Sequence, residues 1–569
     1  MTKRLLVLVL TIVPLLKAAS PAIKVDQVGY APRAPKLAFL ALSGGAPAQT
    51  FTVRRDGDNK IVLTGNWTAP VSDPDSGDQI QTADFTAVQS VGTYYLEVPA
   101  VGRSWPFHIA SDVYRRAYYL AVRGFYGQRC GTAVDLGAEF PGYQHGICHV
   151  AGAYDPSSGK IGYHGSTKGW HDAGDYGRYM VNSGIATGTL LWTAELWGSG
   201  AAGKIGLAIP ESGNGTPDLL SEARWNIDWM LSMQDADGGV WHKQTSAHFC
   251  GFIMPEKDTQ PSLVIGAGRP PFKTSCATAD FAAVTAIAAR VFATYDKPYA
   301  DLCLNASRRA WRWVEVHPDL TFHNPTGITT GEYADDHCAD EVLWAAAELA
   351  RTTRESVFES YFQAHYREFL DQIAVDNPPE WSNMGPFALW TYALGKGKDK
   401  AAVETIRSRS TDMADQIVQR AEGAPYRTTM VRKNYVWGSN GVAANYALQL
   451  LIANRLHPNQ RYVETAMENL HYLFGRNTLS LCFVTQLGSN TVEHIHHRPS
   501  VAGGLPRPWP GLLSGGPNAE RQDPEMQKSV PANTPPARAF LDVSGSYASN
   551  EIAINWNAPL VFALAGVVE

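Results

Sequence analysis

The hydrophobic positions of the chain follow two different periods on either side of residue 111. Between residues 22 and 110, apolar and polar residues alternate in short runs, as at Phe51 and Val53 or Tyr94 and Leu96. A period of two predicts β-strands with one buried face, and the Asp-Gly-Asp-Asn run at 56–59 has turn chemistry. Short strands at this spacing favour a β-sandwich of immunoglobulin size over residues 23–110.

Beyond residue 111 the apolar residues recur at helical spacing. In the segment 278–295, Phe281, Val284, Ala288 and Val291 fall on one stripe, with Thr278 as the expected N-cap. Similar stripes occupy 217–233, 340–352, 441–456 and 460–474. Stretches rich in Gly, Pro, Asp and Asn separate them at 131–170, 234–275 and 499–540, and loops of that length are usually functional. We therefore expect an all-α domain over 112–569 whose long loops build one face.

The N-terminus predicts export. Lys3 and Arg4 precede twelve mostly apolar residues, a run too short to span a bilayer core of about 30 Å. Residues 1–22 are therefore expected to be a signal peptide, although Lys17 is poor at a cleavage site and an uncleaved anchor is the alternative. The mature protein would be secreted or periplasmic, with no membrane association after cleavage.

Charge and cysteine content exclude some classes of protein. Among 569 residues, 48 are basic and 54 acidic, so the net charge of −6 gives no electrostatic footprint for nucleic acid. The seven cysteines are odd in number and scattered along the chain. A disulfide framework is therefore not expected, and a local metal site is the hypothesis to examine. The 16 Trp, 24 Tyr and 20 Phe either fill cores or offer flat faces to sugars.

Two groups of acidic residues have the pattern of catalytic carboxylates. Asp172 and Asp175 flank Ala-Gly, and a tight turn there would aim both at one water or cation; the alternative is an N-cap with a salt-bridged neighbour. Glu551 lies among Tyr547, Ile552 and other apolar residues, a setting that raises a carboxyl pKa and suits a general acid. A solvent-facing Glu at a helix start is its alternative.

The segment 488–498 carries side chains that can donate hydrogen bonds. His496 and Arg498 can hold sugar hydroxyls, whereas a metal pair of His494 with His496, or a loop salt bridge of Arg498, are the alternatives. A base and an acid on separate segments are what an inverting sugar hydrolase requires.

Taken together, these motifs resemble glycoside hydrolase family 9, the inverting cellulases, over nearly the whole chain. The Asp-Ala-Gly-Asp-Tyr motif is at 172–176 and the Gly-x-Asn…His-x-Arg signature at 488–498, where Ile495 stands in place of the Pro of many relatives. The acid signature is matched by Phe540, Asp542, Tyr547, Glu551, Asn557 and Ala558. The opening residues 24–30 are similar to the immunoglobulin-like domain of one branch of that family.

The resemblance implies a fold and a set of roles. The helical domain would be an (α/α)6 barrel of six inner and six outer helices behind the β-sandwich. Asp175 would be the catalytic base, Asp172 would help to hold the nucleophilic water, and Glu551 would be the acid. Substrate would be held by two donors and two stacking aromatics, namely His496, Arg498, Trp344 and Trp556.

Two metal sites are also expected. Cys130, Cys148, His149 and His171 would make a closed, structural zinc set, with His145 as a rival ligand and a reduced cysteine pair as the alternative. The resemblance favours zinc. Oxygen ligands for calcium are offered by Ser212, Gly213, Asp218 and Glu222, where the alternative is a capped helix with a solvated acidic face.

These expectations describe a secreted, monomeric enzyme that hydrolyses β-1,4-glucan or cello-oligosaccharides with inversion, most simply as an endoglucanase. Its alternatives within the family are an exo-acting β-glucosidase, a cellobiohydrolase or a glucosaminidase, whose blocked cleft would be encoded at 150–169 and 259–275. A sugar-binding protein without catalysis is disfavoured because all three carboxylates are present, and a zinc hydrolase because four ligands leave no open position.

Overall fold

The N-terminal domain is a sandwich of two β-sheets. The computed structural model describes residues 18–42 and 47–568, so residues 1–17 of the expected signal peptide lie outside the described part. One sheet has the order β1-β3-β7-β6, with bounds Ile23–Lys24, Leu37–Leu42, Gln79–Asp84 and Val71–Ser72. The other has the order β2-β10-β8-β4-β5, with β9 beside β8 and bounds Gly29–Tyr30, Phe107–Ile109, Gly92–Val98, Thr50–Arg55, Ile61–Asn66 and Gly102–Arg103.

Aromatic rings fill the space between the two sheets. The ring of Tyr30 meets Phe85 and Phe107 edge-on, at centroid distances of 5.2 and 5.4 Å. Leu40 of one sheet and Leu96 of the other complete this core, and both are fully buried. The alternation of apolar and polar residues in the sequence thus corresponds to inward-facing and outward-facing side chains of the strands. The expected immunoglobulin-like sandwich is confirmed.

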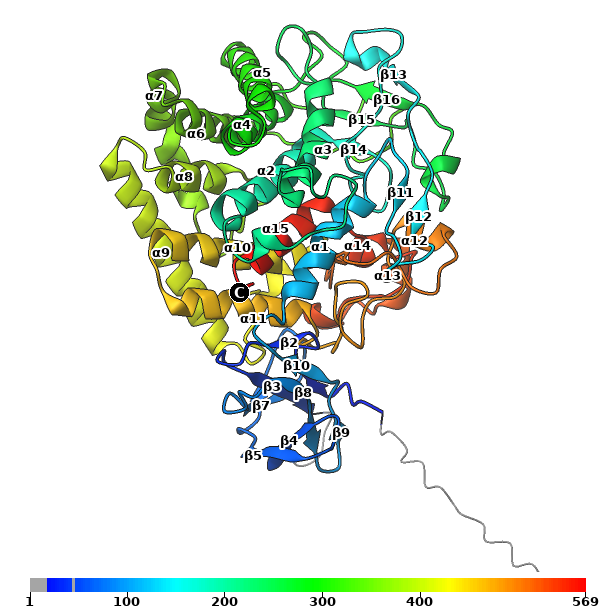
Figure 1. Ribbon diagram of the computed structural model, residues 1–569, viewed down its shortest axis with the longest axis vertical. Coiled ribbons are helices and arrows are strands. Elements are labelled where there is room, and N and C mark those ends of the chain that lie inside the picture. The colour runs from blue at the N-terminus through cyan, green and yellow to red at the C-terminus, as the bar shows by residue number, and fades with distance from the viewer. Residues whose placement is uncertain (1–17, 43–46, 569) are drawn as a thin grey trace, which may run out of the picture.

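The second domain is the expected (α/α)6 barrel (Figure 1). Its inner helices pack in a closed ring, α2-α4-α6-α8-α10-α15, with bounds Met180–Trp197, Ser275–Phe292, Ala339–Thr353, Gly385–Leu394, Ser439–Leu456 and Ile554–Ala565. The outer helices are α1, α3, α5, α7, α9 and α11, with bounds Arg115–Gly127, Asp218–Ser232, Lys297–Val316, Ser356–His365, Lys400–Gly423 and Gln460–Leu473.

The inner helices are buried on every side, which explains their composition. Every residue of α2 from Met180 to Thr193 is buried. A helix that is apolar all round belongs in a core of this kind. Among the described helices only α4 has the length and hydropathy of a membrane span, and 89% of that window is buried inside the barrel.

Helix α4 begins earlier than the sequence predicts. The N-cap position is Thr274, whereas Thr278 lies inside the helix and its hydroxyl donates back to the Thr274 carbonyl at 2.7 Å. The first turn is buried beside residues 317–320, where the Ser275 hydroxyl donates to the His317 carbonyl at 2.6 Å. An apolar stripe does not mark a first turn that is fixed by such contacts, so Thr278 as N-cap is wrong.

The long loops gather on one side of the barrel. They contain the strands β11 to β16, with bounds Val134–Asp135, Gln144–His145, Gly152–Tyr154, Arg178–Tyr179, Lys243–Thr245 and Ser262–Ile265. They also contain three short helices, α12, α13 and α14, with bounds Arg498–Ala502, Pro524–Ser529 and Tyr547–Asn550. Strands β13, β16, β15 and β14 form one sheet, which fixes the loops before and after the first aspartates.

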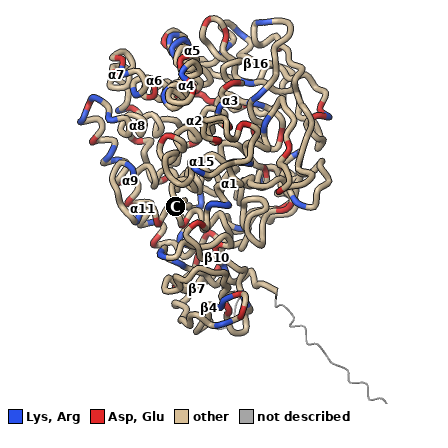
Figure 2. The backbone as a smooth tube through the Cα atoms, in the orientation of Figure 1, with Lys and Arg blue, Asp and Glu red and all other residues tan. Residues whose placement is uncertain are grey.

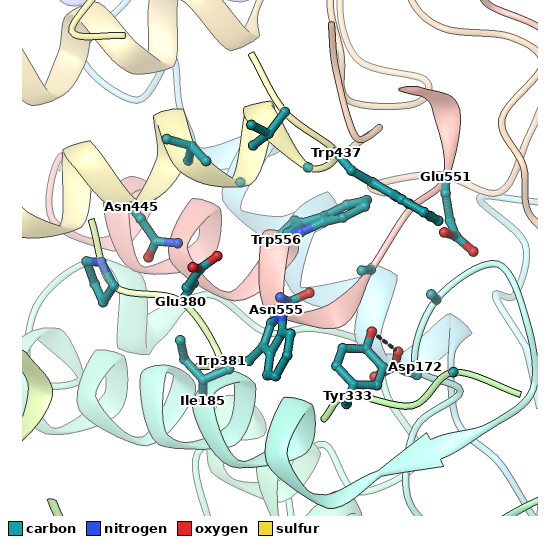
Figure 3. A pocket seen from close by; sticks show the side chains of 18 of the residues that line it. Asp172, Ile185, Tyr333, Glu380, Trp381, Trp437, Asn445, Glu551, Asn555 and Trp556 are labelled. Carbon is teal, nitrogen blue, oxygen red and sulfur yellow. Dashed lines mark hydrogen bonds between the residues drawn. The ribbon is translucent and has the colours of Figure 1, made fainter. Parts of the chain in front are cut away.

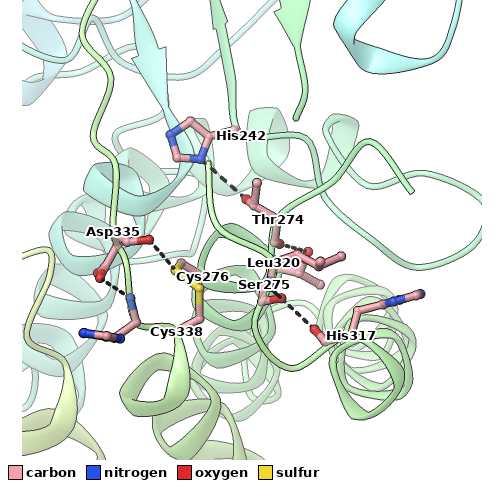
Figure 4. Close-up of a disulfide and its surroundings, with 10 residues drawn as sticks. His242, Thr274, Ser275, Cys276, His317, Leu320, Asp335 and Cys338 are labelled. Carbon is pink, nitrogen blue, oxygen red and sulfur yellow. Dashed lines mark hydrogen bonds between the residues drawn. A yellow bond between two sulfur atoms is a disulfide. The ribbon is translucent and has the colours of Figure 1, made fainter. Parts of the chain in front are cut away.

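The described chain contains one disulfide, which the scattered cysteines of the sequence did not predict. It joins Cys276 of α4 to Cys338, the residue before α6, and the other five cysteines are free (Figure 4). Basic and acidic residues are interspersed over both domains (Figure 2).

The two domains are joined by buried polar contacts. The Asp26 carboxylate lies 2.7 Å from the His471 ring, and both side chains are almost fully buried. Asp78 accepts hydrogen bonds from Tyr426 and Thr478 of the barrel at 2.7 and 2.8 Å. Because buried polar groups are costly when unpaired, these contacts favour one relative orientation of the domains.

Candidate active site

One cavity of about 740 Å³ opens on the loop side of the barrel, and the three expected catalytic carboxylates line it (Figure 3). Asp172 and Asp175 come from the turn before β14, and Glu551 from the segment between α14 and α15. The inner helices α2, α10 and α15 supply other parts of its wall, through Ile185, Asn445 and Trp556. Asp172 and Glu551, 379 positions apart in the sequence, therefore meet because the barrel closes on itself.

The aspartate turn is held by a close backbone approach. A Cβ built on Gly174 would lie 2.1 Å from the His496 carbonyl oxygen, so no larger residue fits there. The Gly174 carbonyl in turn accepts the Arg498 backbone N–H at 3.1 Å and its guanidinium at 2.7 Å. The two sequence signatures thus contact each other directly.

Asp172 is buried and held on both oxygens. Tyr333 donates to one and Asn182 to the other, each at 2.6 Å. Burial, and after it the charge of Asp175, raise the pKa of Asp172 to about 8, while these two donors oppose the shift. At neutral pH a proton is therefore favoured on Asp172.

Asp175 uses a single oxygen for its protein contacts. Its Oδ2 accepts from the Gly177 backbone N–H at 2.9 Å and from the Tyr179 hydroxyl at 3.1 Å. Its Oδ1 has no hydrogen-bond partner among the described residues, although the side chain is only 7% exposed. That oxygen is left for a ligand or water in the cavity.

Glu551 is only partly exposed and its backbone is fixed on both sides. The Gly515 N–H donates to its carbonyl at 2.7 Å, and residues 551 and 496 form a β-bridge. Burial raises the pKa of Glu551 well above its usual range, and the charge of Asp175 adds to the shift while Arg498 opposes it. A carboxyl in this state keeps its proton near neutral pH, as a general acid must.

The two expected hydroxyl-binding residues are largely occupied by the protein. Arg498 donates to the Cys250 carbonyl as well as to Gly174, and the Nδ1 of His496 lies 2.6 Å from the Ser544 carbonyl. Neither residue lines the cavity in the described chain. Arg498 therefore positions the catalytic turn, and any grip on substrate would use only its remaining N–H groups.

The two expected stacking tryptophans differ. Trp344 is fully buried on inner helix α6, 5.8 Å from the Phe387 ring, and does not line the cavity, so its assignment to substrate is wrong. Trp556 does line the cavity. A Cβ on Gly441 would lie 2.4 Å from the Trp556 ring, so the missing side chain at 441 lets the indole lie flat against α10.

The structure gathers the four expected zinc ligands. The potential ligand atoms of Cys130, Cys148, His149 and His171 all lie within 4.8 Å of one another. His145 lies outside this group, and its Nδ1 is 2.8 Å from the Gly146 carbonyl, so His149 is the better fourth ligand. Two thiols and two imidazoles form a donor set that fits tetrahedral zinc.

Two further groups surround this cluster. The Asp258 carboxylate lies 3.4 Å from the Nε2 of His149, the nitrogen remote from Cys130. Metal-binding histidines usually donate their other nitrogen to such a carboxylate. His171 directly precedes Asp172, so the cluster and the catalytic turn share one segment.

The calcium site stays a prediction, and two members of the expected set make contacts within the protein. Both oxygens of Glu222 accept from the Arg129 guanidinium at 3.1 and 2.9 Å, and Trp170 also donates to it. Asp218 accepts instead from Ser212 at 2.6 Å. A guanidinium thus supplies the positive charge at Glu222, while Gly213 lies in a turn with a φ of 87°.

A second group of potential metal ligands lies beside the disulfide. Cys276, Asp335 and Glu341 have ligand atoms within 4.8 Å of one another. The Cys276 sulfur is bonded to Cys338 and cannot act as a thiolate. Burial raises the pKa of Glu341 well above its usual range, and that of Asp335 to about 6.

Sequence reasoning missed the residues that hold the aspartates. Tyr333, Asn182 and Tyr179 contact them directly, yet no motif marks these three. The cavity also includes Trp381 and Trp437, the latter 40% exposed. Exposure of a large aromatic in a cavity is the signal that separates them from core tryptophans, and only the structure provides it.

Comparisons with known proteins agree with this geometry. The family model described as glycosyl hydrolase family 9 matches residues 114–564, and the one described as cellulase N-terminal ig-like domain matches 18–103. The chain is 38% identical over 551 residues to Endoglucanase D of Acetivibrio thermocellus, covering 96% of this chain and 83% of that protein.

Solved structures agree as well. A metagenome-derived family 9 endoglucanase superposes with a TM-score of 0.87 at 34% identity, covering 96% of this chain and 99% of that one. A zinc-binding triple mutant of the family 9 endoglucanase J30 has a TM-score of 0.86 at 34% identity, with 95% and 99% covered.

The two tryptophans give a matched test of the cavity. Trp344→Ala is expected to cost about 3–5 kcal/mol of unfolding free energy, with kcat/KM per folded molecule unchanged. Trp556→Ala is expected to raise KM for cello-oligosaccharides about two- to tenfold through lost stacking. Urea unfolding and steady-state kinetics measure both, and a Trp344→Ala protein of normal stability with weakened substrate binding would refute the correction.

Proposed function

The chain belongs to glycosyl hydrolase family 9, and from that membership and the carboxylates of its cavity we propose that it is a secreted endo-β-1,4-glucanase that inverts the anomeric centre. The observation that carries the proposal is the convergence of Asp172, Asp175 and Glu551 on one cavity, with Glu551 held in its acid form. Endoglucanase D, similar over most of its length, supports the endo reading.

The proposed reaction is a single displacement. Asp175, through its unpartnered oxygen, takes a proton from a water as that water attacks the anomeric carbon. Asp172 helps to orient the same water, and Tyr333 and Asn182 keep its carboxyl in place. Glu551 gives its proton to the departing glycosidic oxygen from the other side of the sugar.

Glu551 forms no hydrogen bond to either aspartate among the described residues, and all three carboxyl groups line one cavity that can hold sugar and water. An inverting enzyme needs that room, whereas a retaining enzyme places its two carboxyl groups closer together. The catalytic cycle needs a charged base and a protonated acid at the same pH, so the two groups must be in opposite protonation states.

The first test is a product time course from cellohexaose, with the anomeric configuration followed by NMR. We expect α-anomers to appear first and early mixtures of mid-length oligomers. Early release of glucose or cellobiose alone would contradict the endoglucanase proposal and indicate an exo-acting enzyme. Initial β-anomers would contradict inversion.

Replacement of the acid provides a second test. Glu551→Gln is expected to lower kcat/KM for cello-oligosaccharides by about 10²- to 10⁴-fold. The loss should be much smaller for 2,4-dinitrophenyl β-cellobioside, whose leaving group needs no proton. Exposed Glu520→Gln serves as the control.

The pH profile follows from the same residue. Because the pKa of Glu551 is raised, wild-type activity falls as the pH rises through that value and the acid loses its proton. The Gln variant should lack this alkaline limb with the activated substrate. An unchanged limb, or full activity on oligosaccharides, would reject Glu551 as the acid.

We also propose that Cys130, Cys148, His149 and His171 hold a structural zinc ion. The support is their mutual approach within 4.8 Å and the chemistry of the donor set. When bound, zinc would cross-link residues 130, 148–149 and 171, and so hold the loop from which Asp172 projects. Asp258 would orient the His149 ring.

Removal of one thiol tests the zinc proposal. Cys148→Ser is expected to reduce zinc content from one per chain to well below half and to lower the Tm, since metal binding contributes to folding. Elemental analysis and calorimetry measure these effects. Cys303→Ser, at another buried free cysteine, is the control; stoichiometric zinc in Cys148→Ser would remove the assignment.

A further inference from the structure

Lys243 is a buried lysine that the proposed mechanism does not use. It lies on β15 directly opposite Tyr179 of β14, so the two side chains share one face of that sheet. Lys243 is fully buried, and buried charges are usually paired. Buried Lys273, for example, pairs with Asp235 and Asp237. Lys243 forms no ion pair with any described residue, so its charge is compensated in another way.

Uncharged oxygen atoms surround the end of the Lys243 side chain. Its Nζ donates to the side-chain oxygen of Asn324 at 2.6 Å and to the Gly331 carbonyl at 2.8 Å. The hydroxyl and the carbonyl of Thr330 lie at 3.2 and 3.3 Å. An ammonium group has three N–H donors and no acceptor, so four acceptor oxygens around one nitrogen match its charged form. The lysine therefore ties residues 330–331 to β15.

These contacts reach the wall of the catalytic cavity. Gly331 and Tyr179 are among the described residues that line the cavity, whereas Lys243 is not. A Cβ built on Gly331 would lie 3.2 Å from the Tyr179 ring, so the backbone of residue 331 packs against that tyrosine. The Lys243 Nζ lies 5.6 Å from the centre of the same ring, where a cation is attracted to the aromatic face. Lys243 thus supports two neighbouring parts of the wall without facing the substrate.

Tyr179 connects this arrangement to the catalytic base. Its hydroxyl donates to the Oδ2 of Asp175 at 3.1 Å. Burial lowers the pKa of Lys243 to about 7, while the charges of Asp175 and then Glu332 oppose the shift. The attraction that favours a proton on Lys243 equally favours a negative charge on Asp175, because the interaction between two charges is mutual.

A second buried lysine shows what a purely structural role looks like. Lys36 of the N-terminal sandwich is also fully buried, and its Nζ donates to the backbone carbonyls of residues 31, 32 and 34 at 3.4, 2.7 and 2.8 Å. Those contacts fix one loop of the sandwich. Lys243 differs because its partners include the cavity wall and the aromatic ring that binds the base.

We propose that Lys243 is a positioning residue for the catalytic base. Its ammonium group holds the Gly331 carbonyl and the Tyr179 ring, so that the tyrosine keeps its hydrogen bond to Asp175. Its positive charge also stabilises the carboxylate that accepts the proton of the attacking water. The inference rests on the proposed function, in which Asp175 is the base. Because Lys243 does not line the cavity, it affects the chemical step and not the binding of glucan.

Two substitutions separate the charge of Lys243 from its packing. Lys243→Met has a similar length without charge or N–H groups, and is expected to lower kcat for cellotetraose about 10- to 100-fold with KM changed less than about twofold. Lys243→Gln keeps an N–H donor for residues 330–331 and should lose nearly as much, since it carries no charge. It also decides the question if Lys243→Met does not fold. Lys36→Met is the matched control, with a lowered Tm and an unchanged kcat.

A double variant tests the route through the tyrosine. Tyr179→Phe removes the hydrogen bond to Asp175, so Lys243→Met should lower kcat by a smaller factor in that background than in the wild type. Steady-state kinetics per folded molecule, with Tm from calorimetry, measure each variant.

Three results would overturn the role of Lys243 in an enzyme that is active as the wild type: full kcat in Lys243→Gln, a loss confined to KM, or equal factors in both backgrounds. A wild-type enzyme that cleaves no cello-oligosaccharide would instead overturn the proposed function, and the role of Lys243 with it.

Discussion

The carbonyl oxygen of Gly174 is the contact on which the catalytic geometry depends. It accepts both the backbone N–H and the guanidinium of Arg498, across 324 residues of sequence. Because His496 is bridged to Glu551, this contact sets the aspartate turn against the acid segment. Three carboxyl groups that repel one another therefore stay in one cavity, since backbone contacts fix the segments that carry them.

Burial, and after it the charge of Asp175, also sets Asp172 and Glu551 apart from an ordinary carboxyl group. Asp172 and Glu551 are buried among like charges, and both have raised pKa values. Asp175 offers one oxygen to the protein and leaves the other for the cavity. In the proposed mechanism Glu551 acts as the protonated acid, in keeping with its raised pKa, and burial likewise favours a proton on Asp172.

The sequence predicts what depends on local pattern and misses what depends on distant contacts. Periodicity predicts the sandwich and the helices, motifs mark the carboxylates, and the family resemblance supplies the zinc ligands. The sequence does not reveal the Arg129 guanidinium that binds Glu222, because Arg129 lies 93 residues earlier. It fails at Trp344 as well, since a helical stripe does not distinguish an inward position in a barrel core from a wall of the cavity.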